Sequence, residues 1–168
     1  MANFSPIQRT PFAPNETCDE PAWRFQMKAY IDTSVLVKRY VSEPGSDVLD
    51  RFLVTTQPDL VASELARLEL VSAFGRKCRD GRFPSTDLDK LQIQVDADLL
   101  SGAIEMVTLH RDVLQRALGL MRGLTQPVAT LDAIHLASAL AQRVELFMTN
   151  DQQLGRAAAE VGLATWTA

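Results

Sequence analysis

Short apolar runs alternate with longer amphipathic ones from Lys28 onwards, and this alternation constrains the fold more than any other feature of the sequence. It is typical of βα units, in which the strands of a parallel sheet are covered by helices. The sequence therefore predicts the α/β fold class. The expected strands are 29–31, 60–62, 104–108, 146–149 and, more weakly patterned, 164–166.

The segments between these strands carry helical patterns with recognisable ends. We expect helices over 34–41, 45–55, 64–80, 85–100, 110–119, 131–143 and 151–162. Small polar residues precede several of them and can accept hydrogen bonds from the free N–H groups of the first turn. The expected N-terminal caps are Ser63, Ser85 or Thr86, Thr130, and Asn150 or Asp151, and Gly81 is expected to end the third helix.

The 168 residues suffice for one well-cored domain. Residues 1–26 hold four of the eight prolines and show no helical or strand period, which predicts a flexible N-terminal extension before a domain over 27–168. Met27 opens this domain so abruptly that it is an alternative start of translation. Intact-mass measurement of protein expressed from its own upstream sequence would decide this.

Composition narrows the class of protein. A net charge of −4 excludes a general positive field for coating nucleic acid, but it allows a local basic patch. The two cysteines, Cys18 and Cys78, form neither a Cys-x-x-Cys pair nor a zinc pattern with histidines. Since the sequence also shows neither a membrane span nor a secretory signal, we expect a soluble, cytoplasmic protein.

Two aspartates follow strands of the predicted parallel sheet. Asp32 follows the first strand and Asp151 follows 146–149, so both are expected at the carboxyl edge of the sheet, where open α/β folds place their ligands. Each could equally be only the N-cap of the next helix. The functional interpretation depends on several acids converging on one cleft, as right-handed crossovers allow.

Two further acids lie on predicted helices. Glu69 shares a helical stripe with Leu65 and Ala73, so its carboxylate is expected to face the sheet and to need a cation or a strong hydrogen-bond partner. A salt bridge to Arg67, Lys77 or another base is the alternative. Asp132 lies in the first turn of its helix, where the helix dipole alone could explain it.

A cluster of such acids would need neutralising. Two carboxylates about 4 Å apart repel by about 4 kcal/mol at an effective dielectric constant of 20, and a divalent cation would relieve this repulsion. Oxygen ligands, without cysteine or a histidine pair at helical spacing, favour Mg²⁺ or Mn²⁺ over zinc. His135, one turn after Asp132, could be imagined as a general base, but a packed or hydrogen-bonded structural histidine is favoured.

With these residues identified, the stretch from Met27 to about Gly162 resembles the PIN-domain family and, within it, the VapC-type toxins. Four short patterns occur in the family's order and spacing. They are Tyr30-Ile31-Asp32-Thr33-Ser34-Val35-Leu36-Val37, the 65–73 helix with Glu69, Leu131-Asp132-Ala133-Ile134-His135-Leu136-Ala137, and Met148-Thr149-Asn150-Asp151-Gln152-Gln153-Leu154. The Pro-rich extension is the one departure.

The resemblance implies a three-layer α/β/α sandwich with a central, mostly parallel sheet. It also implies a Mg²⁺- or Mn²⁺-dependent endoribonuclease, the toxin of a toxin–antitoxin pair, restrained by a cognate VapB-like antitoxin and expected to form a homodimer. The implied acidic pocket and metal site is Asp32, Glu69, Asp132 and Asp151, with Ser34 and Thr149 as supporting hydroxyls. A noncatalytic RNA- or partner-binding module is the alternative function.

RNA that approaches an acidic pocket needs basic residues nearby. The available clusters are Lys38, Arg39, Arg76, Lys77, Arg79 and Arg82, although the later four could be only a solvated helix end. Other classes lack their signatures. A haloacid-dehalogenase-like phosphatase would need an aspartate where Ser34 stands, a receiver domain a lysine later than Lys90, and a nucleotide-binding enzyme a Gly-rich loop.

Overall fold

A computed structural model of the protein describes residues 27–168, and the predictions for residues 1–26 lie outside this part. In the described part, one sheet holds five strands, all parallel, in the order β3-β2-β1-β4-β5. Each predicted strand is confirmed to within one residue at either end. The strands are β1 Lys28–Ile31, β2 Asp59–Ser63, β3 Ile104–Val107, β4 Leu146–Met148 and β5 Ala164–Trp166.

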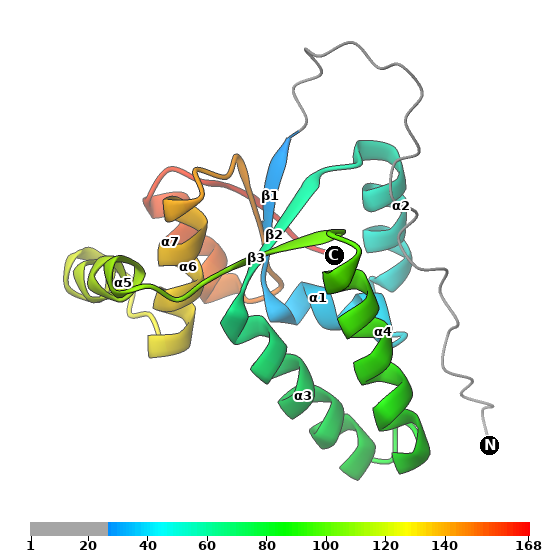
Figure 1. The fold of residues 1–168 in the computed structure, drawn as a ribbon. Coiled ribbons are helices and arrows are strands. Elements are labelled where there is room, and N and C mark those ends of the chain that lie inside the picture. Colours follow the sequence, from blue (N-terminus) through cyan, green and yellow to red (C-terminus); the bar gives the residue numbers. More distant parts are fainter. Residues whose placement is uncertain (1–26) are drawn as a thin grey trace.

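Strand β1 lies at the centre of the sheet, at the point where the order in which strands are added reverses. From β1 the chain adds β2 and β3 on one side, and it then crosses to add β4 and β5 on the other side. The carboxyl ends of β1, β2 and β4 consequently lie next to one another (Figure 1). Open α/β sheets bind their ligands outside such a point, because the loops separate there.

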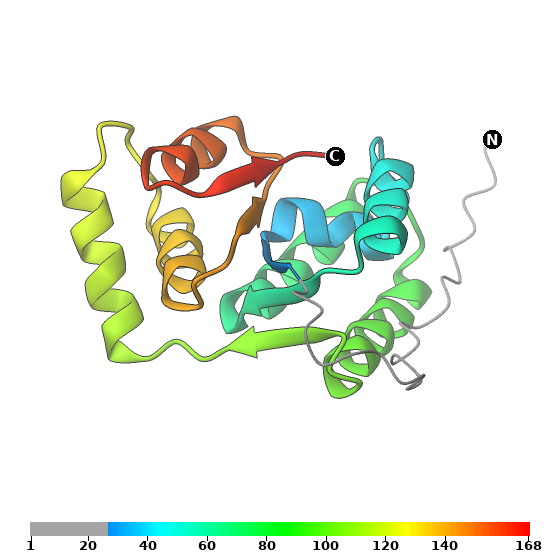
Figure 2. The ribbon, with the colours of Figure 1, turned by 90° about the horizontal axis from the view of Figure 1, so that it is seen from above.

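Helices cover both faces of the sheet, which confirms the three-layer α/β/α class (Figures 1 and 2). The described helices are α1 Thr33–Tyr40, α2 Ser46–Thr56, α3 Glu64–Arg79, α4 Leu88–Leu100, α5 Arg111–Gly123, α6 Thr130–Ala141 and α7 Gln152–Glu160, with a short 3₁₀ turn at Ser85–Asp87. Side chains of a strand alternate between faces. Ala29 and Ile31 therefore pack in the core with α1 to α4, whereas Tyr30 packs in the core with α6 and α7.

Helix α5 packs on α6 rather than on the sheet, through Val113 and Ala117 against Ala133 and Ala137. Figure 2 shows α5 as the outermost element on that side of the molecule. It runs to Gly123, four residues beyond the predicted end at Gly119. Within residues 27–168, no helix combines the length and the apolar character that a membrane crossing requires.

Two of the predicted caps are confirmed. The Ser63 hydroxyl accepts from the Leu65 amide at the start of α3, and the Asp151 carboxylate caps α7. The prediction of Thr130 as a cap is wrong, because α6 is capped by Ala129 and Thr130 is its first residue. Asp132 lies in the first turn of α6, where the free backbone N–H groups and the helix dipole favour its negative charge.

The prediction that Ser85 or Thr86 caps the fourth helix is also wrong. Both residues belong to the 3₁₀ turn, in which the Asp87 amide donates to the Pro84 carbonyl, and α4 begins at Leu88. Proline favours this outcome because it fixes the entry backbone and tolerates a tight first turn. The error displaces the helix start by three residues.

Candidate metal centre

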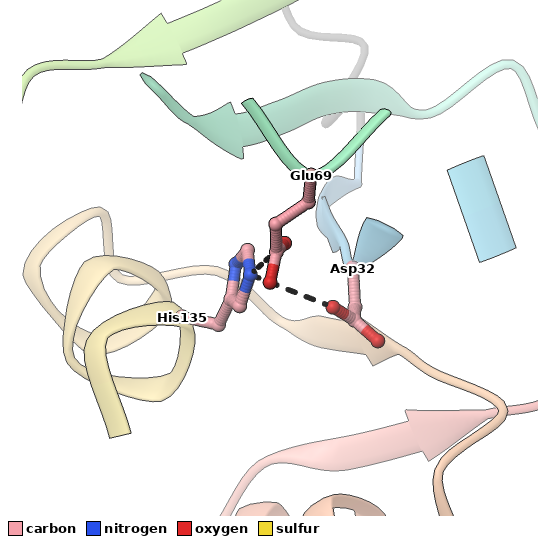
Figure 3. A group of neighbouring side chains, drawn as sticks. All are labelled: Asp32, Glu69 and His135. Atoms are coloured by element: carbon pink, nitrogen blue, oxygen red, sulfur yellow. Dashed lines mark hydrogen bonds and ion pairs between the residues drawn. The ribbon is translucent and has the colours of Figure 1, made fainter. Parts of the chain in front are cut away.

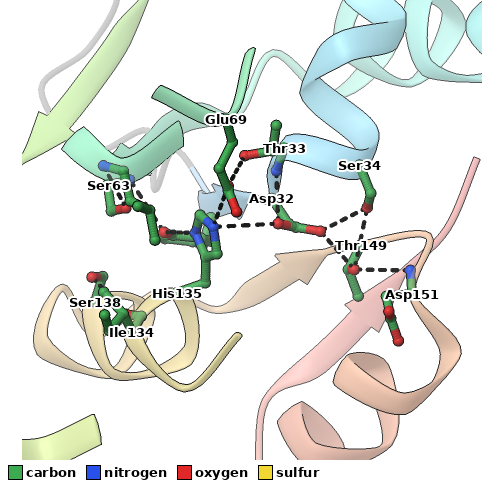
Figure 4. A network of polar contacts seen from close by, with 12 residues as sticks. Asp32, Thr33, Ser34, Ser63, Glu69, Ile134, His135, Ser138, Thr149 and Asp151 are labelled. Atoms are coloured by element: carbon green, nitrogen blue, oxygen red, sulfur yellow. Dashed lines mark hydrogen bonds and ion pairs between the residues drawn. The ribbon is translucent and has the colours of Figure 1, made fainter. Parts of the chain in front are cut away.

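Asp32 lies where β1 becomes α1, and three donors fix its carboxylate. Oδ1 accepts from the Thr33 amide at 2.7 Å, so Asp32 does cap α1. Oδ2 accepts from Ser34 Oγ at 2.6 Å and from Thr149 Oγ1 at 3.0 Å (Figure 4). The residue is only 6% exposed, so its charge is held near the base of the site and depends on these donors for stabilisation.

The loop after β4 brings Thr149 and Asp151 to the same edge of the sheet. Thr149 is fully buried, and besides donating to Asp32 its hydroxyl accepts from the Asp151 amide at 3.1 Å. Oδ1 of Asp151 accepts from the amides of Gln153 and Leu154, at 2.7 and 3.0 Å. Asp151 therefore caps α7, and its carboxylate is exposed. Thr149 connects the two acids, because its hydroxyl donates to Asp32 and accepts from the Asp151 amide.

Glu69 reaches the site from the second turn of α3. Its Oε2 accepts from Thr33 Oγ1 at 2.5 Å and lies 2.7 Å from His135 Nε2. The alternative partners considered from the sequence are occupied elsewhere, since Arg67 pairs with Asp96 and Lys77 with Glu43. The expectation that Glu69 faces the sheet and needs a strong partner is confirmed, and its partner within the protein is a histidine.

His135 is nearly fully buried beneath the acids, on α6 (Figure 3). Its Nδ1 lies 2.7 Å from the Tyr30 hydroxyl and its Nε2 lies 3.7 Å from Asp32 Oδ1. The preferred interpretation of His135 as a hydrogen-bonded structural histidine is confirmed. One potential ligand atom from each of Asp32, Glu69 and His135 lies within 4.8 Å of the other two.

The sequence analysis missed Tyr30 and Thr33 as members of this network. Each carried a signal that could have found it. Tyr30 is a phenol in a strand buried on both faces, and a buried hydroxyl requires a partner. Thr33 follows Asp32 directly, in the first turn of a helix that starts at the site.

Opposing charges shift the pKa values of the site residues. Partial burial would raise the pKa of Glu69, but hydrogen bonds from His135 and Thr33 outweigh it and lower the pKa overall. Burial would lower the pKa of His135, but the hydrogen bond to Glu69 and the charge of Asp32 raise it overall. Glu69 and His135 thus favour each other's charged forms.

Asp132 shows that the negative charge of the site is not fully compensated. Burial raises its pKa, and the nearby carboxylates of Asp151 and Asp32 raise it further, while His135 opposes them. A divalent cation held by carboxylate oxygens would relieve this repulsion. The carboxylate oxygens therefore fit a divalent cation. Among the described residues, Asp32 and Glu69 belong with His135 to the group of ligand atoms within 4.8 Å of one another, whereas Asp132 and Asp151 lie outside it, although the charges of Asp151 and Asp32 reach Asp132.

The basic residues predicted to contact RNA divide into two groups. Lys38 is buried and donates to the Pro44 carbonyl, Arg39 lies beside the buried Asp98, and Lys77 pairs with Glu43, so these three have structural partners. Lys38 in particular cannot be reached by RNA in this conformation. The exposed members of the set are Arg76, Arg79 and Arg82, at the end of α3 and in the turn after it.

Comparison with curated proteins identifies two relatives from Mycobacterium tuberculosis. Ribonuclease VapC46 of strain ATCC 25618 / H37Rv is 36% identical over 138 residues, which cover 80% of this chain and 93% of the relative. Ribonuclease VapC47 of strain CDC 1551 / Oshkosh is 31% identical over 146 residues, which cover 81% and 93%. Both alignments span nearly the whole of the relative.

Solved structures share the fold at lower sequence identity. M. tuberculosis VapC20, described as a sarcin-ricin loop cleaving toxin, superposes with a TM-score of 0.63 at 15% identity, covering 82% of this chain and 97% of that chain. FitAcB from Neisseria gonorrhoeae gives a TM-score of 0.62 at 15% identity, covering 82% and 96%. The PIN domain model matches residues 29–160. This chain therefore belongs to the PIN-domain family.

Proposed function

We propose that the protein is a Mg²⁺- or Mn²⁺-dependent endoribonuclease and acts as the toxin of a toxin–antitoxin pair. The observation that carries the proposal is geometric: carboxylate oxygens of Asp32 and Glu69, from distant parts of the chain, lie within 4.8 Å of each other at the carboxyl end of β1. The relatives named as VapC ribonucleases support the same activity. A hydrolase of this kind cleaves phosphodiester bonds with water.

Asp32, Glu69, Asp132 and Asp151 would hold the cation. When bound, Mg²⁺ or Mn²⁺ would lower the pKa of a water molecule and stabilise the charge that develops on the attacked phosphate. The protein contributes a rigid arrangement of the acids. Ser34 and Thr149 fix one oxygen of Asp32, and Thr33 and His135 fix one oxygen of Glu69. The expected products carry 5′-phosphate and 3′-hydroxyl ends.

RNA must reach this acidic edge from the solvent. Arg76, Arg79 and Arg82 are the exposed bases of the predicted set, on the same helix as Glu69 or directly after it. We propose that they contact phosphates of the RNA on either side of the cleaved bond. Such contacts set affinity and register without selecting a base sequence.

Cleavage of RNA by the purified full chain tests the activity. With Mg²⁺ or Mn²⁺ the chain should cut RNA, EDTA should stop cleavage, and Asp32→Asn should abolish it while the circular dichroism spectrum is unchanged. Asp47→Asn is the matched control, because Asp47 is an exposed acid that pairs with Arg51 on α2. A fully active Asp32→Asn variant would contradict the site assignment. Mn²⁺ binding without cleavage of any RNA would indicate a noncatalytic module.

The toxin role implies partners and a place of action. We propose that a VapB-like antitoxin restrains the nuclease in the cytoplasm, where its RNA substrate is found, and that the domain over 27–168 forms a homodimer. Solved relatives with this fold include a toxin-antitoxin complex from Klebsiella pneumoniae. Induction of the chain in bacteria should arrest growth, the arrest should vanish with Asp32→Asn, and co-expression of a cognate VapB-like antitoxin should relieve it.

A further inference from the structure

A chain of buried hydrogen bonds runs from β2 to Glu69 behind the acidic edge (Figure 4). The Ser63 amide donates to the Tyr30 hydroxyl at 3.1 Å, this hydroxyl lies 2.7 Å from His135 Nδ1, and His135 Nε2 lies 2.7 Å from Glu69 Oε2. Ser63 and Tyr30 are fully buried and His135 is 1% exposed, so water does not compete for these groups. The direction of each hydrogen bond can therefore be worked out from the groups themselves.

The Ser63 backbone N–H can only donate, so it occupies a lone pair of the Tyr30 oxygen. Where His135 is neutral, the phenol proton can then point at His135 Nδ1. A neutral imidazole that accepts at Nδ1 carries its proton on Nε2 and donates it to Glu69. In the other neutral tautomer Nε2 has no proton, so two hydrogen-bond acceptors, Nε2 and Glu69 Oε2, would face each other across 2.7 Å.

The conclusion holds whichever charge His135 carries. An imidazolium has protons on both nitrogens, so Nε2 again donates to Glu69. A protonated Nε2 has no lone pair for a metal ion. His135 lies within ligand distance of Asp32 and Glu69, yet the hydrogen bonds assign it a different task from that of the acids.

The hydrogen bonds leave the two oxygens of Glu69 in different situations. Oε2 takes both recorded donors, Thr33 Oγ1 and His135 Nε2. Within residues 27–168, neither of these bonds involves Oε1, so that oxygen is the one left for a ligand. Packing supports the arrangement, because the Tyr30 ring stacks on Phe147 with centroids 5.3 Å apart and meets His135 edge-on at 5.9 Å.

We propose that Tyr30 and His135 are positioning residues for Glu69. The hydrogen bond between the Tyr30 hydroxyl and Nδ1 fixes the His135 ring, and the Nε2–H of this ring holds Oε2 so that Oε1 is presented as the ligand oxygen. The proposal rests on the proposed function only in that Glu69 binds the divalent cation. It deepens that function by separating the residues that touch the cation from those that orient a ligand.

Mn²⁺ binding to the full chain, measured by isothermal titration calorimetry, tests the proposal without any RNA. Tyr30→Phe keeps the ring and removes only the hydroxyl, and it should weaken Mn²⁺ binding about tenfold, as loss of an outer partner of a ligand typically does. Tyr40→Phe is the matched control. Tyr40 is also buried and also donates to a carboxylate, Asp98, away from the site.

The control separates positioning from simple loss of packing. Urea unfolding in EDTA should show both variants folded with lowered midpoints, whereas Mn²⁺ affinity should fall for Tyr30→Phe and stay within twofold of wild type for Tyr40→Phe. A folded Tyr30→Phe variant that binds Mn²⁺ with wild-type affinity would overturn the proposal. If Tyr30→Phe does not fold, the His135 variants decide.

Two replacements of His135 distinguish its two nitrogens. His135→Gln places an amide N–H near the position of Nε2, so it should retain Mn²⁺ affinity within about threefold of wild type by keeping a donor to Glu69. His135→Asn places its amide near the position of Nδ1 and should lose about tenfold or more. Equal affinity for the two variants would overturn the proposal.

Nitrogen-15 NMR reads the histidine protons directly in the metal-free chain. The chain has 2 histidines, and His110 is exposed, so a His110→Gln variant assigns the His135 signals. Wild type should show a protonated Nε2 whether His135 is neutral or charged. An unprotonated Nε2 in wild type would overturn the proposal.

These outcomes are distinguishable from failure of the proposed function. If the chain binds Mn²⁺, binds it more weakly with Tyr30→Phe and cleaves no RNA, the positioning role is supported and the nuclease function is contradicted. If wild type and Tyr30→Phe both cleave RNA and bind Mn²⁺ with equal affinity, the nuclease function is supported and the positioning role is contradicted. A wild-type chain that binds no Mn²⁺ overturns both.

Discussion

Replacing Asp132 with Asn should make the metal-free protein more stable, although it damages the site. The pKa of Asp132 is raised by burial and by the charges of Asp151 and Asp32, so the ionised carboxylate destabilises the folded chain at neutral pH. Asparagine has nearly the same shape, and its amide oxygen can still accept a hydrogen bond. The change therefore removes the charge and little else.

The magnitude follows from Coulomb's law with solvent screening. Even two unit charges as close as about 4 Å repel by only about 1 kcal/mol in water, and by about 4 kcal/mol at an effective dielectric constant of 20. Because Asp132 is only half-buried, the value lies toward the lower limit, and we expect a gain of about 0.5–1 kcal/mol. With a urea m-value of about 2 kcal/mol/M, the unfolding midpoint should rise by about 0.3–0.5 M.

Urea unfolding of wild type, Asp132→Asn and the control Asp47→Asn, each in EDTA and in saturating Mn²⁺, is the assay. Binding at 100 times the dissociation constant stabilises wild type by about 2.7 kcal/mol, so the order should reverse when Mn²⁺ is present. The advantage in EDTA should also shrink as the pH falls below the ordinary carboxyl range, where Asp132 is protonated in both states. A metal-free Asp132→Asn variant less stable than wild type would refute the reasoning.

Further changes around the site have defined outcomes. Ser34→Ala and Thr149→Val each remove a donor to Asp32 Oδ2 and should lower kcat/KM for RNA cleavage about tenfold, whereas Thr149→Ser should stay near wild type. The pKa of His135 is raised, so the stability that its protonated form contributes is present below pH 6.5 and is lost as the pH rises through the raised pKa. The urea midpoints of wild type and His135→Gln should therefore converge as the pH rises. Arg79→Ala should weaken RNA binding in a filter assay and reduce its salt dependence by about one counterion, with Mn²⁺ affinity unchanged.

Local patterns were sufficient to predict the parallel sheet and the placement of two acids. The apolar runs identified every strand of the described sheet, and Asp32 and Asp151 follow strands that turned out to be neighbours. The helical stripe of Glu69 correctly placed it toward the sheet. Each of these predictions needs only the period of a helix or a strand and the rule that parallel strands end at one edge.

The partners of these acids could not be predicted in the same way, because they are distant in the sequence. Tyr30 and His135 are 105 residues apart, and Glu69 and His135 are 66 apart. The local sequence offers Arg67 and Lys77 only as alternative partners of Glu69, and packing of α6 against the sheet brings His135 there instead.

The central claim is that folding gathers scattered carboxylates around one divalent cation. A crystal of the full chain grown with Mn²⁺, with anomalous diffraction recorded at the manganese edge, tests it most directly. The account predicts an anomalous peak bound by Asp32, with Glu69, Asp132 and Asp151 bound to it directly or through water, and with His135 still hydrogen-bonded to Glu69. A peak elsewhere, or no peak at this edge of the sheet, would contradict it.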